Sequence, residues 1–271
     1  MNSKVLSIAG FDGSGGAGIQ ADLKTFSAFS CYGMTVLTAL PIQNTLGVKT
    51  CYELPLQAIE DQLYAIFTDI VPDTIKIGML FNASIIELVA NFLKQQAKGI
   101  PIVLDPVMYA KSGDALLLPQ ALESLRTQLI PLATLITPNL PEATALTGLS
   151  VNQPEEMEIV MQQLLVLGPK AVLLKGGHLQ GNQSVDLYED QQGTKQWLDA
   201  PRIMTRNTHG TGCTLSAAIA ACLSRKMSLL ESCKMAKRYL TCALQAAKLQ
   251  QIGRGNGPLN HSYYQENAFP V

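Results

Sequence analysis

The chain has 271 residues, of which 47% are hydrophobic and 15% charged, and its 20 basic and 21 acidic residues leave a net charge of -1. These values are typical of a folded globular protein that can bury a sizeable core, and they argue against disorder. The balanced charge provides no basic surface for nucleic acid or for an anionic membrane, so we expect neither as a partner. An anionic ligand would have to be held by local geometry.

The N-terminus and the cysteines indicate a cytoplasmic protein. The first apolar run, residues 5–9, is too short for the hydrophobic segment of a secretory signal. The uncharged stretch between Lys24 and Lys49 is broken by Gly33, Pro41 and several polar residues, which argues against a membrane span. The six cysteines include no C-x-x-C pair, so we expect reduced thiols.

Short apolar runs alternate with segments of helical periodicity along most of the chain. This alternation predicts an α/β fold with a central, mainly parallel sheet and helices on both faces. Between residues 183 and 199 the pattern changes to two short strands around Gln191-Gln192-Gly193, which predicts a small hairpin at the sheet edge. No linker or repeat interrupts the chain, so we expect one domain over residues 1–271. The expected strands are residues 5–10, 34–40, 74–77, 102–104, 132–136 and 171–174, and the expected helices are residues 19–29, 55–70, 84–96, 213–225 and 228–250.

Polar or glycine-rich motifs follow several of these strands. Ligands of open α/β sheets bind beyond the carboxyl ends of the strands, so motifs at equivalent positions predict one shared site there. The motifs are G-F-D-G-S-G-G-A-G (10–18), L-D-P-V-M-Y-A-K-S-G-D (104–114), T-P-N-L-P-E (137–142), K-G-G-H (175–178) and H-G-T-G-C (209–213).

The last of these motifs is the most informative one. Gly210, Thr211 and Gly212 lead into a helix of small residues, so free backbone N–H groups and a helix N-terminus surround Cys213. The partial positive charge there suits a phosphoryl group in transit and favours the thiolate of the cysteine, a candidate base or nucleophile. The same residues also suit a tight turn before a packing helix with a buried cysteine. This segment alone leaves both interpretations open.

The first motif matches a dinucleotide-binding fingerprint without its acidic partner. Residues 13–18 read G-x-G-x-x-G, but a site for NAD also needs an acidic residue about 20 positions later. None lies between Asp22 and Glu53. The chain also lacks the Gly-Lys pair of a Walker motif and the D-F-G and H-R-D strings of protein kinases. An enzyme of this sequence that moves a phosphoryl group must use another scaffold.

In combination, the motifs resemble those of one family. From Val5 to the tail segment 253–259, the chain is similar to the hydroxymethylpyrimidine/phosphomethylpyrimidine kinases of thiamin biosynthesis, members of the ribokinase-like superfamily. The resemblance implies a ribokinase-like fold, a homodimer, ATP as co-substrate and Mg²⁺. It also implies phosphorylation of 4-amino-5-hydroxymethyl-2-methylpyrimidine to the monophosphate and then to the diphosphate. The segments that carry it are residues 9–10, Asp12, 14–24, 43–45, 76–80, 105–108, 111–114, 137–139, 175–178 and 209–213.

The chemistry of these residues suits phosphoryl transfer, a reaction that depends on positioning and charge stabilisation. The amides of residues 210–213 would hold the moving phosphoryl group, and Lys175 could neutralise a nucleotide phosphate. Asp105 and Glu142 carry hard oxygen atoms that can organise Mg²⁺ directly or through water. The residues expected at ATP are Asn139, Glu142, Lys175, Gly176, Gly177 and His178.

On the substrate side, the resemblance implies that Cys213 accepts the proton of the substrate hydroxyl, because it stands where sugar-kinase relatives carry an aspartate base. Whether it is a base or only positions the hydroxyl stays open. Gln43 offers both an amide donor and an acceptor, which suits an aminopyrimidine edge, and its place matches the family's pyrimidine-binding glutamine. The other residues expected in this pocket are Gly10, Asp22, Met79 and Val107.

Several of these residues also have ordinary structural explanations. Asp105 before Pro106 could cap a turn, and Asn139 with Glu142 has the spacing of a helix cap. The resemblance favours a site over these caps. Lys237 lies on a helix with an apolar face, where most lysines are solvated. The histidines are too scattered along the chain to indicate a zinc site.

Three residues near the expected pocket, Phe11, Gly13 and Pro41, depart from the family pattern, which leaves its fit to the substrate open. The closest rival is pyridoxine/pyridoxal kinase of the same superfamily, some members of which share the cysteine-bearing glycine loop. Gln43 and the K-S-G-D string favour the pyrimidine enzyme. A nicotinamide-dependent oxidoreductase and a non-catalytic ligand-binding protein are the rivals from other classes.

Overall fold

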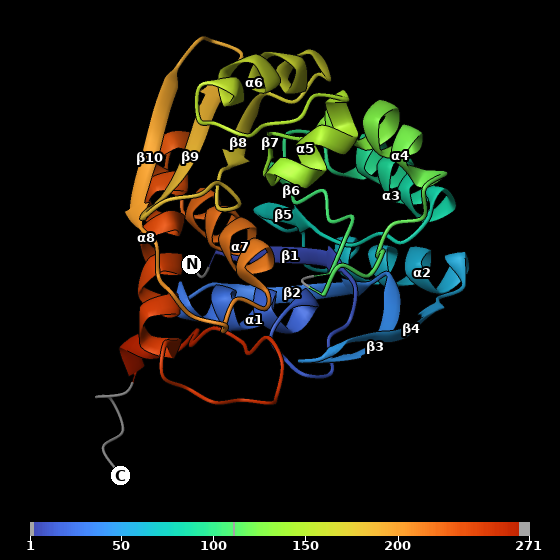
Figure 1. The fold of residues 1–271 in the computed structure, drawn as a ribbon. Coiled ribbons are helices and arrows are strands. Elements are labelled where there is room, and N and C mark those ends of the chain that lie inside the picture. The colour runs from blue at the N-terminus through green and yellow to red at the C-terminus, as the bar shows by residue number, and fades with distance from the viewer. Residues whose placement is uncertain (1–2, 111, 266–271) are drawn as a thin grey trace.

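A central eight-stranded sheet organises the computed structural model, which describes residues 3–110 and 112–265 (Figure 1). Its strand order is β10-β9-β8-β7-β6-β5-β1-β2. The neighbours from β2 to β8 run parallel, whereas β9 and β10 add an antiparallel hairpin at one edge. The strands are β1 (Lys4–Ala9), β2 (Tyr32–Leu37), β5 (Thr74–Ile77), β6 (Ile102–Leu104), β7 (Leu135–Ile136), β8 (Ala171–Lys175), β9 (Gln183–Asp190) and β10 (Lys195–Pro201). The predicted α/β sheet and its edge hairpin are confirmed.

Helices cover both faces of this sheet (Figure 1). On one face lie α1 (Gly18–Ala28), α7 (Thr211–Ser224) and α8 (Leu229–Ala247). The other face carries α2 (Leu56–Phe67), α3 (Ala83–Gln96), α4 (Ala121–Ser124), α5 (Leu140–Thr147) and α6 (Glu156–Val166). A π-helical turn (Leu125–Leu129) and a 3-10 turn (Ile130–Leu132) follow α4, and a 3-10 turn (Tyr263–Gln265) follows α8. Among the residues that the structure describes, no helix combines the length and apolarity that a membrane crossing needs.

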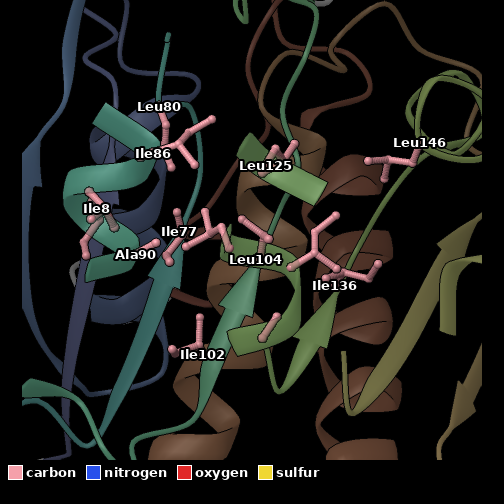
Figure 2. Packing of buried hydrophobic residues seen from close by; sticks show 14 of the residues in the cluster. Ile8, Ile77, Leu80, Ile86, Ala90, Ile102, Leu104, Leu125, Ile136 and Leu146 are labelled. Carbon is pink, nitrogen blue, oxygen red and sulfur yellow. The ribbon is translucent and has the colours of Figure 1, made fainter. Parts of the chain in front are cut away.

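Neighbouring residues of each central strand pack on opposite faces of the sheet. Val103 packs with α1, α7 and α8, while Leu104 belongs to the core of the opposite face. Figure 2 shows Leu104 beside Ile77 and Ile136, between the strands and their covering helices. A parallel strand covered on both sides needs apolar residues at consecutive positions, which explains the unbroken apolar runs of the sequence.

Helix α7 is buried along most of its length, from Thr214 to Ser224. It packs against the sheet and against both α1 and α8. Small side chains let a helix approach several neighbours closely, which accounts for the alanine-rich sequence of this segment. The rigid packing fixes the start of α7 relative to the strand ends.

The expected strand over residues 34–40 is divided between two sheets. Strand β2 ends at Leu37, and the chain then enters β3 (Ala39–Asn44), which pairs with β4 (Gly47–Glu53) in a separate antiparallel sheet. The break occurs at the buried Thr38, whose N–H donates to Ala9 O (3.1 Å) and whose hydroxyl donates to Met79 O (2.6 Å). Strand β4 was not predicted, because its residues are exposed or half-buried and lack an apolar face. The expected strand 132–136 is likewise shorter, since a 3-10 turn occupies Ile130–Leu132.

Candidate active site

A cleft of about 630 Å³ opens beyond the carboxyl ends of the parallel strands. All of the glycine-rich and polar motifs contribute to its wall, as the position of strand ends in an α/β sheet predicts. Two of the expected site residues, Asp22 and Gly176, do not line it. The expected residues that line it are Gly10, Gln43, Met79, Asp105, Val107, Asn139, Glu142, Lys175, Gly177, His178, Gly210, Thr211, Gly212 and Cys213.

The H-G-T-G-C motif forms the N-terminus of α7. Gly210 is the N-cap residue with φ of 81°, and an added Cβ there would overlap the carbonyl of Gly16. At Gly212, a Cβ would lie 3.1 Å from Asp105 Oδ2 and 3.3 Å from Lys175 Nζ. Only glycine allows the approach at position 210, while a Cβ at position 212 would require Asp105 or Lys175 to shift by a few tenths of an ångström. The first N–H groups of a helix have no partner within it, so this turn offers donors to an anion beside Lys175.

Cys213 belongs to the first turn of α7 and is not the last residue of the loop. Burial raises the pKa of its thiol to about 11, although the nearby Lys76 ammonium acts in the opposite direction. The sequence predicts that the helix N-terminus favours the thiolate of Cys213, whereas the raised pKa keeps the thiol protonated near neutral pH. Desolvation of the sulfur outweighs the favourable charge of Lys76 and the backbone hydrogen bond from Gly18.

Lys175 joins the two carboxylates that were expected at the metal. Its Nζ lies 2.9 Å from Asp105 Oδ1 and 3.9 Å from Glu142 Oε2. Burial opposes the ammonium, but the Asp105 carboxylate and then Glu142 raise the pKa of Lys175 above its usual value. Burial also raises the pKa of Glu142 to about 7. This lysine therefore stays charged at the floor of the cleft.

Asn139 and Glu142 form a helix cap, as their spacing in the sequence allows, and both also line the cleft. The Glu142 N–H donates to Asn139 Oδ1 (2.9 Å), and the Asn139 N–H donates to Glu142 Oε2 (2.7 Å), so the two form the capping box of α5. The same Glu142 oxygen faces Lys175 across 3.9 Å. A helix cap and a cleft carboxylate are thus one group, and capping fixes the direction of that carboxylate.

Asp105 and Glu142 are the carboxylates expected to organise Mg²⁺. Within the described ranges, no three His, Cys, Asp or Glu side chains gather closely enough to form a metal site of their own. Mg²⁺ usually keeps several waters and binds through one or two carboxylates together with substrate phosphates. Two cleft carboxylates beside a lysine fit that mode of binding, and they do not fit an all-protein cage.

Gln43 lies on β3 at a shift in the β3–β4 register, between Ile42 and Gln43. Its Nε2 donates to the carbonyl of Phe11 at 3.1 Å, which turns the amide into the cleft wall. Met79 shares this wall, and an added Cβ at Gly10 would lie 2.9 Å from Met79 Sδ. A glycine at position 10 therefore leaves room for the methionine beside the glutamine.

The K-S-G-D string packs against the same hairpin. Asp114 Oδ2 accepts hydrogen bonds from the Ser112 hydroxyl (2.6 Å) and from the Val48 N–H of β4 (3.0 Å). Lys111, the first residue of the string, lies outside the described residues. The contact explains how a loop after β6 and the hairpin of Gln43 come to line one cleft.

Asp22 lies beneath the cleft, away from its surface. Its carboxylate accepts hydrogen bonds from Lys76 Nζ (2.8 Å) and from the Ser7 hydroxyl (2.5 Å), and all three side chains are fully buried. Lys76 does line the cleft, although sequence reasoning gave it no role. The available signal was a lysine at the centre of T-I-K-I, an otherwise apolar parallel strand.

A second buried pair, beside the K-G-G-H segment, was not predicted. Lys237 Nζ lies 2.6 Å from Asp186 Oδ2, and both residues line the cleft. Asp186 Oδ1 also accepts the N–H of Gly176 at 3.1 Å, which places the K-G-G-H segment. The expectation that Lys237 is solvated is wrong, because β9 places a carboxylate opposite it. No local pattern reveals a partner that is 51 positions away.

These features define the class of the protein as a ribokinase-like kinase, and solved structures agree. The Bacillus subtilis pyridoxal kinase, solved as an ADP complex, superimposes with a TM-score of 0.88 at 37% identity, covering 98% of this chain and 100% of that one. A phosphomethylpyrimidine kinase from Clostridium difficile gives a TM-score of 0.78 at 43% identity, covering 89% and 98%. The expected ribokinase-like fold is confirmed.

The family is shown by sequence. The family model described as phosphomethylpyrimidine kinase matches residues 12–260. The hydroxymethylpyrimidine/phosphomethylpyrimidine kinase of Salmonella typhimurium is 51% identical over 258 residues, which span 94% of this chain and 96% of that protein. The chain belongs to the phosphomethylpyrimidine kinase family. The resemblance drawn from the motifs is confirmed, and an oxidoreductase or a non-catalytic binding protein is set aside.

Proposed function

We propose that the protein uses ATP to phosphorylate 4-amino-5-hydroxymethyl-2-methylpyrimidine to its monophosphate and then phosphorylates the monophosphate to the diphosphate. One observation carries the proposal. The N-terminus of α7 and the pair Lys175–Asp105 meet in the same cleft that Gln43 lines. An anion site and a polar group suited to an aminopyrimidine edge thus share one cavity. Membership of the kinase family supports the same substrates.

The proposed phosphoryl site comprises the amides of Gly210, Thr211, Gly212 and Cys213. They would stabilise the charge on the equatorial oxygens of the moving group, and Lys175 would do so from the side of Asp105. Because these donors are fixed by the packing of α7, little reorganisation is needed during transfer. The substrate oxygen forms a bond to phosphorus as the bond from phosphorus to the ADP oxygen breaks. In the first phosphorylation, the hydroxyl proton must also leave the substrate oxygen.

Cys213 is the proposed acceptor of that proton. Burial keeps its thiol neutral, with a pKa of about 11, so the sulfur can accept a proton only after losing its own. The Lys76 ammonium, which lines the same cleft, favours that loss. A neutral thiol could instead orient the substrate hydroxyl. The two roles differ in the pH dependence of turnover.

ATP is proposed to lie over Asn139, Glu142 and the segment Lys175 to His178. Lys175 is the cation for its phosphates, and the Lys237–Asp186 pair holds Gly176 in place beside them. Asp105 and Glu142 would hold Mg²⁺ through water. The ion, when bound, neutralises phosphate charge. The ADP complex of the Bacillus subtilis pyridoxal kinase supports a nucleotide site in this fold.

The pyrimidine is proposed to lie between Gln43, Gly10, Met79 and Val107, which line the cleft. Asp22 was expected to touch it, and we now propose that Asp22 acts from below through Lys76. We further propose a single-domain, cytoplasmic homodimer. The exposed Ile42, Leu46 and Tyr52 of the β3–β4 region give an apolar surface for a second copy, which light scattering after size exclusion would test.

Pyridoxal is the second candidate substrate, because a pyridoxal kinase superimposes on this chain with a TM-score of 0.88. A coupled assay of ADP release decides between the two. With Mg-ATP, we expect rapid ADP release on addition of hydroxymethylpyrimidine and slower release with pyridoxal. Faster turnover of pyridoxal would overturn the proposed substrate and keep the kinase class.

A further inference from the structure

A buried histidine and aspartate join two loops that line the cleft. His209 Nε2 lies 2.8 Å from Asp12 Oδ2, and the two residues are 197 positions apart in the sequence. Asp12 is fully buried and His209 is 8% exposed. His209 precedes the phosphoryl loop, residues 210–213, and Asp12 begins the glycine loop, residues 12–18. Neither has a role in the function proposed above.

Asp12 fixes the glycine loop around itself. Its Oδ1 accepts the N–H (3.0 Å) and the hydroxyl (2.7 Å) of Ser14, while Oδ2 accepts the N–H groups of Gly16 (3.0 Å) and Ala17 (2.7 Å). Burial opposes the charge, but the bonds from His209 and Ser14 outweigh it and hold the pKa of Asp12 well below its usual range. Because this carboxylate accepts every one of these bonds, we assign the proton between the two side chains to His209 Nε2.

His209 also connects to the tail of the chain. The backbone N–H of His209 donates to Gly257 O at 3.0 Å, and His209 forms a parallel β-bridge with Pro258. An added Cβ at Gly16 would overlap the imidazole ring and lie 3.1 Å from Pro258 Cβ. The ring is thus enclosed by the glycine loop and the tail.

The next residue, Gly210, continues this close packing. Its backbone lies against the Gly16 carbonyl so tightly that a Cβ would overlap the oxygen. Gly210 is also the N-cap of α7. The contact between His209 and Asp12 therefore sets where the phosphoryl loop lies relative to the wall formed by Ala17 and Gly18, which line the cleft.

We propose that His209 is a positioning residue for phosphoryl transfer, acting through its hydrogen bond to Asp12. The inference rests on the proposed function. In-line transfer requires the acceptor oxygen and the phosphorus at about 3–3.5 Å, and a misplacement of about 1 Å can cost about 10²-fold in rate. Binding of each substrate alone does not require that alignment. Loss of the bond therefore lowers kcat more than it raises KM.

The test compares His209→Ala, His209→Gln and His209→Asn with the wild type. We expect His209→Ala to lower kcat by about 10²-fold while KM for ATP and for the acceptor stays within about threefold. The amide of glutamine can donate from nearly the position of Nε2, so His209→Gln recovers most of kcat. Asparagine is too short to reach Asp12 Oδ2, so His209→Asn stays slow.

His261→Ala is the matched control. His261 is also buried, 4% exposed, and its Nε2 lies 2.9 Å from the Thr214 hydroxyl in the first turns of α7. It therefore contacts α7 at a residue that lies just after the phosphoryl loop and does not belong to it. We expect this variant to lose thermal stability with kcat within about threefold of the wild type.

Three results would overturn the inference: normal kcat in His209→Ala, a glutamine variant no faster than the asparagine variant, or an equal loss of kcat in His261→Ala. If His209→Ala does not fold, the comparison of kcat between His209→Gln and His209→Asn still tests the inference. Failure of the proposed function is seen separately, in the wild type. A wild type that turned over only pyridoxal would contradict the substrate, and the same comparison would then be made with pyridoxal as acceptor.

Discussion

The ammonium of Lys76 lies 2.8 Å from the carboxylate of Asp22, and both side chains are completely buried beneath the cleft. Although burial disfavours the ammonium, the Asp22 carboxylate raises the pKa of Lys76 above its usual value. Both charges act on Cys213, where the Lys76 ammonium lowers the pKa of the thiol and the Asp22 carboxylate raises it. A buried ion pair of this kind is costly to break, because removing one partner leaves an uncompensated buried charge.

We expect Lys76→Met to lower the free energy of unfolding by about 3–5 kcal/mol, because Asp22 would be left as an unpaired buried charge. Urea denaturation measures the loss. In Lys76→Met combined with Asp22→Leu no charge remains, so the double variant should lose much less than the two single losses added together. Additive losses would show that the two side chains do not stabilise each other.

Cys213→Ala should lower kcat by about 10² or more with little change in the melting temperature, as expected on removal of a proton acceptor. The pH dependence then distinguishes a base from a positioner. The pKa of the thiol is about 11, so the thiolate fraction rises about tenfold per pH unit below that value. If the thiolate is required, kcat of the wild type rises between pH 7 and 9, in the range where Lys175 stays charged. A flat profile would assign Cys213 to orienting the hydroxyl.

Glu142 gives a prediction about stability and pH. Its pKa is about 7 in the folded protein, above its ordinary value of 4.5, because of burial. Between these two values the folded state binds more protons than the unfolded state, so the contribution of Glu142 to stability is fully present below pH 4.5 and is lost as the pH rises through 7. Glu142→Gln keeps a capping side chain without the charge. The stability of the wild type relative to this variant should therefore fall between pH 5 and 7.5, as measured in urea, and a constant difference would contradict the assignment.

Gln43→Ala should weaken binding of the pyrimidine and leave the affinity for ATP near normal. The nucleotide is proposed to lie at Lys175 and at residues 139–142, away from the β3–β4 hairpin. Loss of one or two hydrogen bonds corresponds to an increase of about 3–30-fold in KM for the pyrimidine. Initial rates with each substrate varied in turn measure both constants. An equal loss of affinity for both substrates would point to a defect in the fold.

Local sequence patterns were sufficient for the sheet and for the motifs at its edge. Apolar runs such as residues 102–104 can only be buried strands in this context, and parallel strands bring their carboxyl ends to one side. Glycines such as Gly210 and Gly212 were also informative, because the tight approach they permit is a property of the residue itself.

Long-range pairing was not visible in the sequence. The partners of Lys76, Lys237 and His209 are 54, 51 and 197 positions away, and no local periodicity relates them. The protonation state of the Cys213 thiol could not be predicted for a similar reason. A helix N-terminus is a local feature, but the desolvation that raises the thiol pKa comes from packing against the rest of the protein.

The last prediction concerns two successive phosphorylations in one cleft. The monophosphate must return with its phosphate where the hydroxyl lay before, so the phosphoryl loop must accept a neutral and an anionic acceptor. Backbone amides at the start of α7 suit both, because they favour negative charge without a dedicated basic side chain for each substrate. With Mg-ATP and hydroxymethylpyrimidine, phosphorus NMR should show the monophosphate rise and then fall as the diphosphate forms. Product that stays at the monophosphate in excess ATP would contradict the two-step assignment and favour a single-step vitamin kinase.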